Sequence, residues 1–132
     1  MWLFTPSQIT AYKVDAPQIL NPLESLSEKP TKDELKLAIN FLSDKYGWRT
    51  VAYSVLIAES GGNPEAENPE WHYIKGKPFC KGSLGLFQLS CLHGKTEDLL
   101  NPRKNIELAF KLWKESGWRI WGVCTNGTVK CF

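Results

Sequence analysis

Three stretches of the chain repeat apolar residues at helical spacing, and this limits the chain to a mainly helical fold. The first stretch begins with a capping box, Thr31-Lys32-Asp33-Glu34, in which the threonine and glutamate side chains each bind the other's backbone N–H. Gly47 suits the end of this helix. Its apolar stripe consists of Leu35, Ala38, Ile39, Leu42 and Tyr46.

The second and third helical stretches have equally clear boundaries. The second starts near Trp48 and stops before Gly61-Gly62-Asn63-Pro64, a strong helix breaker. The third starts at Asn101-Pro102, an N-cap followed by proline at the first helical position, and stops at Gly117. The stripes are Val51, Val55 and Ala58 in the second, and Ile106, Ala109, Phe110 and Trp113 in the third.

The remaining segments have weaker signals. Residues 61–82 are polar and rich in Gly, Pro and Asn, which predicts a long loop, whereas the apolar segment 83–92 fits a helix or a strand. Asn126-Gly127 between β-prone residues predicts a hairpin. Residues 1–30 are rich in proline and are expected to form an extended arm, which leaves residues 31–132 as one domain. The predicted fold class is therefore mainly α (α+β), with a small β-hairpin.

The chain has an even number of cysteines, which allows two disulfides in three connectivities. A turn at residues 127–128 places Cys124 opposite Cys131, whereas a turn at residues 126–127 places it opposite Val129. We favour Cys80–Cys91 together with Cys124–Cys131. Two disulfides predict an oxidising, extracytoplasmic location. No signal peptide is visible at the start of the chain, and no apolar run has membrane-spanning length.

Composition narrows the classes of partner. The 16 basic and 14 acidic residues give a net charge of +2, which does not favour nucleic acid. No CxxC spacing occurs, and no ligand pattern links His72 with His93, so neither a metal nor a cofactor is predicted. Most of the six tryptophans are expected in the core, although exposed ones suit stacking on sugar rings. We expect a monomer.

Glu59 is the first candidate for chemistry. It stands at the end of the second helical stretch, directly before Ser60 and the Gly61-Gly62 breaker. The negative end of a helix dipole and apolar neighbours both disfavour an ionised carboxylate, so the pKa of Glu59 should be raised. A carboxylic acid protonated near neutral pH can act as a general acid. A surface glutamate at a helix end is the plain alternative.

Several short motifs follow Glu59 in a specific order. They are Ala58-Glu59-Ser60-Gly61-Gly62-Asn63-Pro64, then Gly82-Ser83-Leu84-Gly85-Leu86-Phe87-Gln88, then Asn101-Pro102, Asn105-Ile106 and Ala109, and finally Gly117-Trp118 with Trp121. In order and spacing the segment 48–121 resembles the lysozyme-like fold of the soluble lytic transglycosylases and goose-type lysozymes, phage-derived members included. The chain departs from this family in lacking a later Ala-Tyr-Asn-Ala-Gly motif, so the role of its tyrosine is unassigned.

The resemblance implies an enzyme that acts on peptidoglycan glycan strands. Glu59 would be the catalytic acid, protonating the β-1,4 oxygen between N-acetylmuramic acid and N-acetylglucosamine. Ser83 and Gln88 would contact the sugars. Ser60 and Phe87 lie in the matched motifs, and Tyr73 belongs to an aromatic cluster, Trp71-His72-Tyr73, that either stacks on sugar or anchors its loop. These three complete the predicted substrate-binding set.

A second carboxylate would decide the mechanism. A carboxylate pair about 5–5.5 Å apart retains the anomeric configuration, and a pair about 6.5–9.5 Å apart inverts it. The candidates are Glu65, Glu67, Glu70 and Asp98, and for the first three a solvated surface charge is the preferred interpretation. Without a partner, the substrate's own 6-hydroxyl would attack and form a 1,6-anhydro sugar, which is slightly favoured. A non-catalytic sugar-binding module and a chitin-cleaving glycosidase are the alternative functions.

Overall fold

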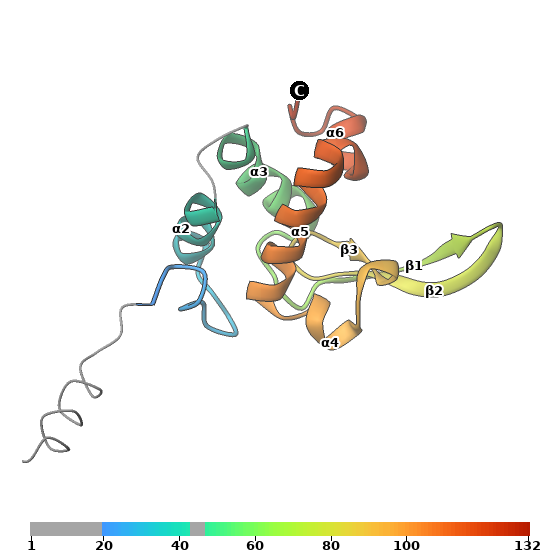
Figure 1. Cartoon of the computed structure of the whole chain (residues 1–132), viewed down its shortest axis with the longest axis horizontal. Helices are drawn as coiled ribbons and strands as arrows, with labels where there is room; N and C mark the ends of the chain where they lie inside the picture. Colours follow the sequence, from blue (N-terminus) through green and yellow to red (C-terminus); the bar gives the residue numbers. More distant parts are fainter. Residues whose placement is uncertain (1–19, 43–46) are drawn as a thin grey trace, which may run out of the picture.

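The structure, a computed structural model, describes residues 20–42 and 47–132. It confirms a mainly helical α+β fold with a small antiparallel sheet (Figure 1). The helices are α2 (Lys32–Leu42), α3 (Trp48–Ser60), α4 (Thr96–Leu99), α5 (Pro102–Ser116) and α6 (Gly122–Thr125). The 3-10 turns are η1 (Cys91–His93) and η2 (Gly117–Ile120). The strands, in sheet order, are β1 (Glu67–Ile74), β2 (Lys77–Leu84) and β3 (Leu89–Ser90).

Helix α2 begins at the predicted capping box. The Thr31 N–H donates to Glu34 Oε1, and the Glu34 N–H donates to Thr31 Oγ1, both at 3.1 Å. Three residues of the predicted stripe are buried and Leu42 is partly buried, while Tyr46 lies outside the described residues. Gly47, expected to end this helix, instead directly precedes α3 with a positive φ of 83°.

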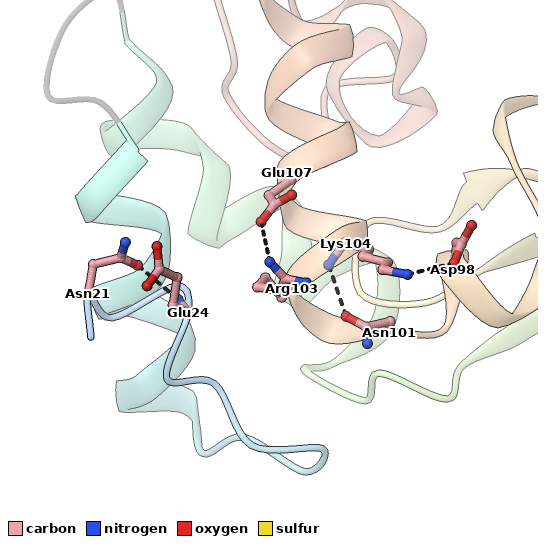
Figure 2. Close-up of polar contacts among 7 residues, drawn as sticks. All are labelled: Asn21, Glu24, Asp98, Asn101, Arg103, Lys104 and Glu107. Atoms are coloured by element: carbon pink, nitrogen blue, oxygen red, sulfur yellow. Dashed lines mark hydrogen bonds and ion pairs between the residues drawn. The ribbon is translucent and has the colours of Figure 1, made fainter. Parts of the chain in front are cut away.

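Local capping also sets the ends of α3 and α5. Gly61 follows α3 with φ 65°, and its N–H donates to the Ile57 carbonyl at 2.8 Å. Asn101 Oδ1 accepts the Lys104 N–H at 3.0 Å at the start of α5 (Figure 2). The Lys104 ammonium also reaches Asp98 at 2.9 Å, which links α4 to the first turn of α5. Helix α5 ends before Gly117, as predicted.

Trp48 is the centre of an aromatic core. Its ring is fully buried, and its Nε1–H donates to the Ile39 carbonyl at 3.1 Å. It stacks on Trp118 with 5.4 Å between ring centroids and contacts Phe87 and Trp113. Such aromatic pairs contribute about 0.5–1.5 kcal/mol each beyond their buried area. Within the described ranges most tryptophans belong to the core, as expected.

The prediction of a long loop at residues 61–82 is wrong. Strands β1 and β2 pair in this region, from Glu67 opposite Leu84 to Ile74 opposite Lys77, and project away from the helices (Figure 1). The connecting residues Lys75 and Gly76 both have positive φ, 51° and 77°, as a type I′ hairpin turn requires. Register irregularities in the ladder, including one that spans Pro69, let the strands tolerate proline.

The predicted hairpin at Asn126-Gly127 is also wrong, because α6 occupies Gly122–Thr125 and a compact turn follows it. The turn is closed by a hydrogen bond from the Val129 N–H to the Val123 carbonyl at 2.8 Å. Both favoured disulfides, Cys80–Cys91 and Cys124–Cys131, are nevertheless present. The second pair therefore meets across a helix end rather than across a β-ladder.

The part of the predicted arm that can be described packs onto the domain. Leu23 is buried in the core, and the turn around it is held by Asn21 Oδ1, which accepts the Glu24 N–H at 2.8 Å (Figure 2). Residues 1–19 lie outside the described residues. Among the helices of residues 20–42 and 47–132, none combines the length and the apolar character needed to cross a bilayer.

Candidate functional site

A cavity of about 380 Å³ opens where the C-terminal end of α3, the root of the β1–β2 hairpin and the segment after α5 meet. Its volume lies within the range of small-ligand sites, about 300–1,000 Å³. Its lining is rich in groups that can donate or accept protons. The lining residues are Glu59, Asn68, Glu70, His72, Ser83, Gln88, Leu89, Ser90, His93, Ile120, Trp121, Gly122, Val123 and Asn126.

Glu59 enters this cavity from the last turn of α3, where it is partly buried. Burial raises the pKa of the Glu59 carboxyl to about 7, and the nearby negative charge of Glu70 adds to the effect. The predicted direction and the predicted desolvation are confirmed. Glu70 was one of four candidates for a second carboxylate, but its effect on the pKa of Glu59 was not predicted. Near neutral pH a substantial fraction of Glu59 is therefore protonated and able to donate.

Glu70 is held in the cavity by Ser83. The Ser83 hydroxyl donates to Glu70 Oε1 at 2.7 Å, and His72 Nε2 lies 3.2 Å from the same hydroxyl oxygen. Because the hydroxyl has one proton, and it points to Glu70, the contact with His72 requires His72 Nε2 to be the donor. The chain of donors runs from His72 through Ser83 to Glu70. This order differs from a serine-nucleophile triad, in which the serine donates to the histidine.

The turn that follows β2 is fixed by Asn105, a fully buried residue of α5. Its Oδ1 accepts the Phe87 N–H at 2.9 Å, and its Nδ2 donates to the carbonyls of Leu84 and Leu99 at 3.0 and 2.7 Å. Gly85 has a positive φ of 78°, and a Cβ there would collide with the Leu99 carbonyl and the Asn105 amide. A side chain at this position would therefore force the Leu99 carbonyl or the Asn105 amide to shift, which destabilises the fold.

Gln88 ends this turn with an unusual backbone. Its φ of 48° lies in the left-handed region, which a side chain larger than hydrogen disfavours. The conformation is supported by the Gln88 Nε2 amide, which donates to the carbonyls of Ala66 and Gly85 at 2.9 and 3.0 Å. Trp121 holds the preceding residue of the same turn, because its Nε1–H donates to the Phe87 carbonyl at 3.0 Å. The strained residue thus sits in the cavity wall on a rigid support.

The structure brings three of the predicted site residues together: Glu59, Ser83 and Gln88 all line the cavity. The Ser83 hydroxyl, however, is buried and committed to Glu70, and the Gln88 amide nitrogen is committed to backbone carbonyls. The two side chains therefore shape the cavity wall, and their expected direct contacts with sugar would have to come from their remaining acceptor atoms.

The other three predicted substrate-binding residues lie outside the cavity lining. The Ser60 hydroxyl turns back to its own helix and donates to the Leu56 carbonyl at 3.1 Å. Phe87 is fully buried against the core aromatics, so it supports the turn from behind. Tyr73 is exposed on β1, beyond the part of the hairpin that faces the cavity.

The sequence analysis did not predict that strand β1 contributes several residues to the cavity lining. Asn68, Glu70 and His72 all line the cavity, and they alternate along the strand with the two-residue spacing that places side chains on one face. The assignment of Glu70 to a loop is therefore wrong, whereas its expected exposure to solvent is confirmed, since 53% of its side chain is exposed. The alternation of polar residues was the available signal, but it is only informative once residues 67–74 are recognised as a strand.

His93 brings a second imidazole to the cavity from η1. Burial, and then the proximity of His72, lower the pKa of His93 below its usual range. The described residues hold no cluster of three His, Cys, Asp or Glu side chains arranged to bind a metal ion. His72 and His93 both line the cavity.

No known family model matches the chain, and neither a curated protein nor a solved structure shows significant similarity to it.

Proposed function

We propose that this chain is a glycosidase of bacterial peptidoglycan, which cleaves the β-1,4 bond between N-acetylmuramic acid and N-acetylglucosamine with Glu59 as its acid. The observation that carries the proposal is the carboxyl group of Glu59, whose pKa is about 7, in an open cavity that also contains Glu70. Two carboxyl groups with different environments in one cavity are the arrangement that glycoside cleavage uses.

In the first step the protonated Glu59 donates its proton to the glycosidic oxygen. The bond between that oxygen and the anomeric carbon breaks, and its electron pair leaves with the oxygen, which becomes the 4-hydroxyl of the departing sugar. Glu59 is left as a carboxylate, and positive charge develops at the anomeric carbon. A negative carboxylate at Glu70, whose side chain is 53% exposed, stabilises that charge by an attraction that solvent partly screens.

The second step needs a nucleophile. The hydrogen bond from Ser83 to Glu70 orients one carboxylate oxygen and leaves the other able to accept a proton from a water molecule. Attack by that water on the anomeric carbon gives a reducing end, with the water's proton passing to the carboxylate. We favour this hydrolysis over attack by the substrate's own 6-hydroxyl, because a second carboxylate lines the cavity. The 6-hydroxyl route would give a 1,6-anhydro end instead.

The proposed site of action is the cell wall, reached outside the cytoplasm or from a phage particle. Two disulfides fit an oxidising environment. A net charge of +2 is compatible with an anionic wall.

The test is the release of glycan fragments from purified peptidoglycan, analysed by mass spectrometry. The wild type should release fragments with reducing ends, and Glu59→Gln should release none while remaining folded. Glu65→Gln is the matched control, because Glu65 is exposed next to the same helix end but does not line the cavity. Full activity of Glu59→Gln would refute the proposal. Fragments lighter by one water would keep Glu59 as the acid and replace the water step by the 6-hydroxyl route.

A further inference from the structure

The outer half of the β1–β2 hairpin, residues 71–81, exposes an unusual number of large apolar side chains. We call this segment the hairpin tip. It points away from the helical body of the molecule (Figure 1). Its exposed apolar residues, with their relative exposures, are Trp71 (52%), Tyr73 (57%), Ile74 (45%) and Phe79 (63%). A soluble protein rarely gathers so much apolar surface on one projecting element unless that surface contacts something.

The hairpin tip is also uniformly basic. It contains Lys75, Lys77 and Lys81, all exposed, and no aspartate or glutamate. The Lys81 ammonium lies 5.9 Å from the centre of the Trp71 ring, so charge and aromatic surface occur side by side. The nearest acid before the tip, Glu70, lines the cavity and accepts a hydrogen bond from Ser83. The lysines of the tip therefore have no carboxylate within their own segment.

The hairpin tip is held in its projecting position. Its two strands form a ladder up to the pair Ile74–Lys77, and the connection is a tight two-residue turn. The disulfide Cys80–Cys91 ties β2 to η1 beside the cavity. The backbone that carries the apolar side chains is therefore held in place, and little backbone entropy is lost when the tip becomes buried against a partner.

We propose that the hairpin tip binds the surface of an anionic lipid bilayer. Tryptophan and tyrosine favour the interface between headgroups and acyl chains, where an apolar ring and a polar edge are both satisfied. Burial of phenylalanine and isoleucine side chains in the acyl region below the headgroups is favourable. Lysines at the same level attract the phosphate headgroups of acidic lipids. The three lysines and four apolar side chains of the tip match this layered surface.

Other occupants fit the hairpin tip less well. A second copy of the chain would bring three lysines against three lysines, which repel each other. A soluble polyanion would satisfy the lysines but leave Phe79 and Ile74 in water. A glycan strand running through the cavity would not reach Trp71 or Tyr73 by way of the cavity lining, because neither residue belongs to it. Of these four surfaces, the bilayer is the one that uses both the charge and the apolar area.

The test is co-sedimentation of the full chain with lipid vesicles. The protein should bind vesicles of phosphatidylglycerol with phosphatidylcholine and should not bind vesicles of phosphatidylcholine alone. Substituting Lys75, Lys77 and Lys81 together by glutamine should weaken the binding about 100-fold, at about fivefold for each lysine. The matched control has the same change of net charge elsewhere, with glutamine at Lys29, Lys32 and Lys111, which are exposed outside the hairpin. The control should bind within about twofold of the wild type.

The apolar contribution is tested separately. Phe79→Ser should weaken vesicle binding about tenfold, and Phe132→Ser, which removes a phenylalanine of comparable exposure (73%, against 63%) outside the hairpin tip, should leave it unchanged. Glu59→Gln should bind vesicles as the wild type does, so this inference stands or falls independently of the proposed activity. Equal binding to neutral and anionic vesicles, or equal losses in the lysine variant and its control, would overturn it. Binding of the tip to peptidoglycan fragments or self-association through it, with no binding to anionic vesicles, would overturn it as well.

Discussion

Replacing Glu59 by glutamine should stabilise the folded protein at alkaline pH and leave its stability unchanged in acid. Glu59 has a pKa of about 7 in the folded protein, against 4.5 for a free glutamate, chiefly because the carboxyl is partly buried. Below about pH 4 the carboxyl is neutral in both the folded and the unfolded chain, so it behaves like an amide. Above pH 7 it is charged in both, and only the folded chain bears the desolvation and the repulsion from Glu70.

The size of the effect follows from the pKa difference. A carboxyl whose pKa rises from 4.5 to about 7 on folding would destabilise the fully ionised protein by about 3 kcal/mol. Because Glu59 is only partly buried, water screens part of this, and we expect about 1–2 kcal/mol. The penalty is absent below the unfolded pKa, grows as pH rises from 4.5 to about 7, and is constant above that range.

Urea unfolding of both proteins at a series of pH values measures this difference. The free energy of unfolding of Glu59→Gln should exceed that of the wild type by about 1–2 kcal/mol at about pH 8.5 and match it at about pH 4, with an unchanged denaturant slope. Glu65→Gln reports the effect of removing an exposed carboxyl. A difference between Glu59→Gln and wild type that does not vary with pH would refute the reasoning.

Three further predictions test the surroundings of Glu59. Glu70→Gln should lower the pKa of Glu59 but leave it above 4.5, because burial is the larger cause of the raised pKa. Carbon NMR of the Glu59 carboxyl measures this pKa, and an unchanged value would contradict the prediction. Ser83→Ala should reduce the rate of peptidoglycan cleavage about two- to tenfold, because Glu70 loses its hydrogen bond. Ser83→Thr keeps the hydroxyl and should restore the rate. A loss that Ser83→Thr does not restore would be due to altered packing instead. Gly85→Ala should destabilise the fold by about 2–4 kcal/mol in thermal unfolding. Gly76→Ala, at a similar φ but in open space, should destabilise it by about 1 kcal/mol. Equal losses of stability would contradict the proposed collision at Gly85.

Helix boundaries were predictable because their signals are local. The Thr31–Glu34 box, the Gly61 cap, the Asn101-Pro102 start and the Gly117 stop each act within one turn of the backbone they satisfy. The position of Glu59 at the end of a helix was predictable for the same reason, since it depends only on nearby residues. The core tryptophans followed from their size and apolar character.

The hairpin was missed because its stability depends on pairing between segments and its turn has an uncommon sequence. Lys75-Gly76 forms a type I′ turn in which the first residue is a lysine, whereas Asn-Gly or Asp-Gly is the usual signal. Pro69 counts against a strand in any local scheme, and the register irregularity that accommodates it is a property of the ladder. Without the strand, Glu70 was only one of four candidates for a second carboxylate and His72 only one member of an aromatic cluster, and no signal selected these two residues.

The C-terminal segment shows the opposite case, in which the pairing was right and the geometry wrong. Asn126-Gly127 is a genuine turn signal, and Asn126 Oδ1 accepts the Thr128 N–H at 2.8 Å, but the residues before it form α6 rather than a strand. Cys124 and Cys131 are close in either arrangement because they are seven residues apart with a turn between them. Short sequence separation was therefore the dependable part of that prediction.

The dependence of peptidoglycan-strand cleavage on pH tests the central claim most directly, because it asks whether a protonated carboxyl with the pKa of Glu59 performs the reaction. The rate for the wild type should be highest in weak acid and fall tenfold for each pH unit above about 7, as Glu59 loses its proton. Absence of cleavage at every pH, or a rate that stays constant well above pH 7, would contradict the assignment of Glu59 as the acid.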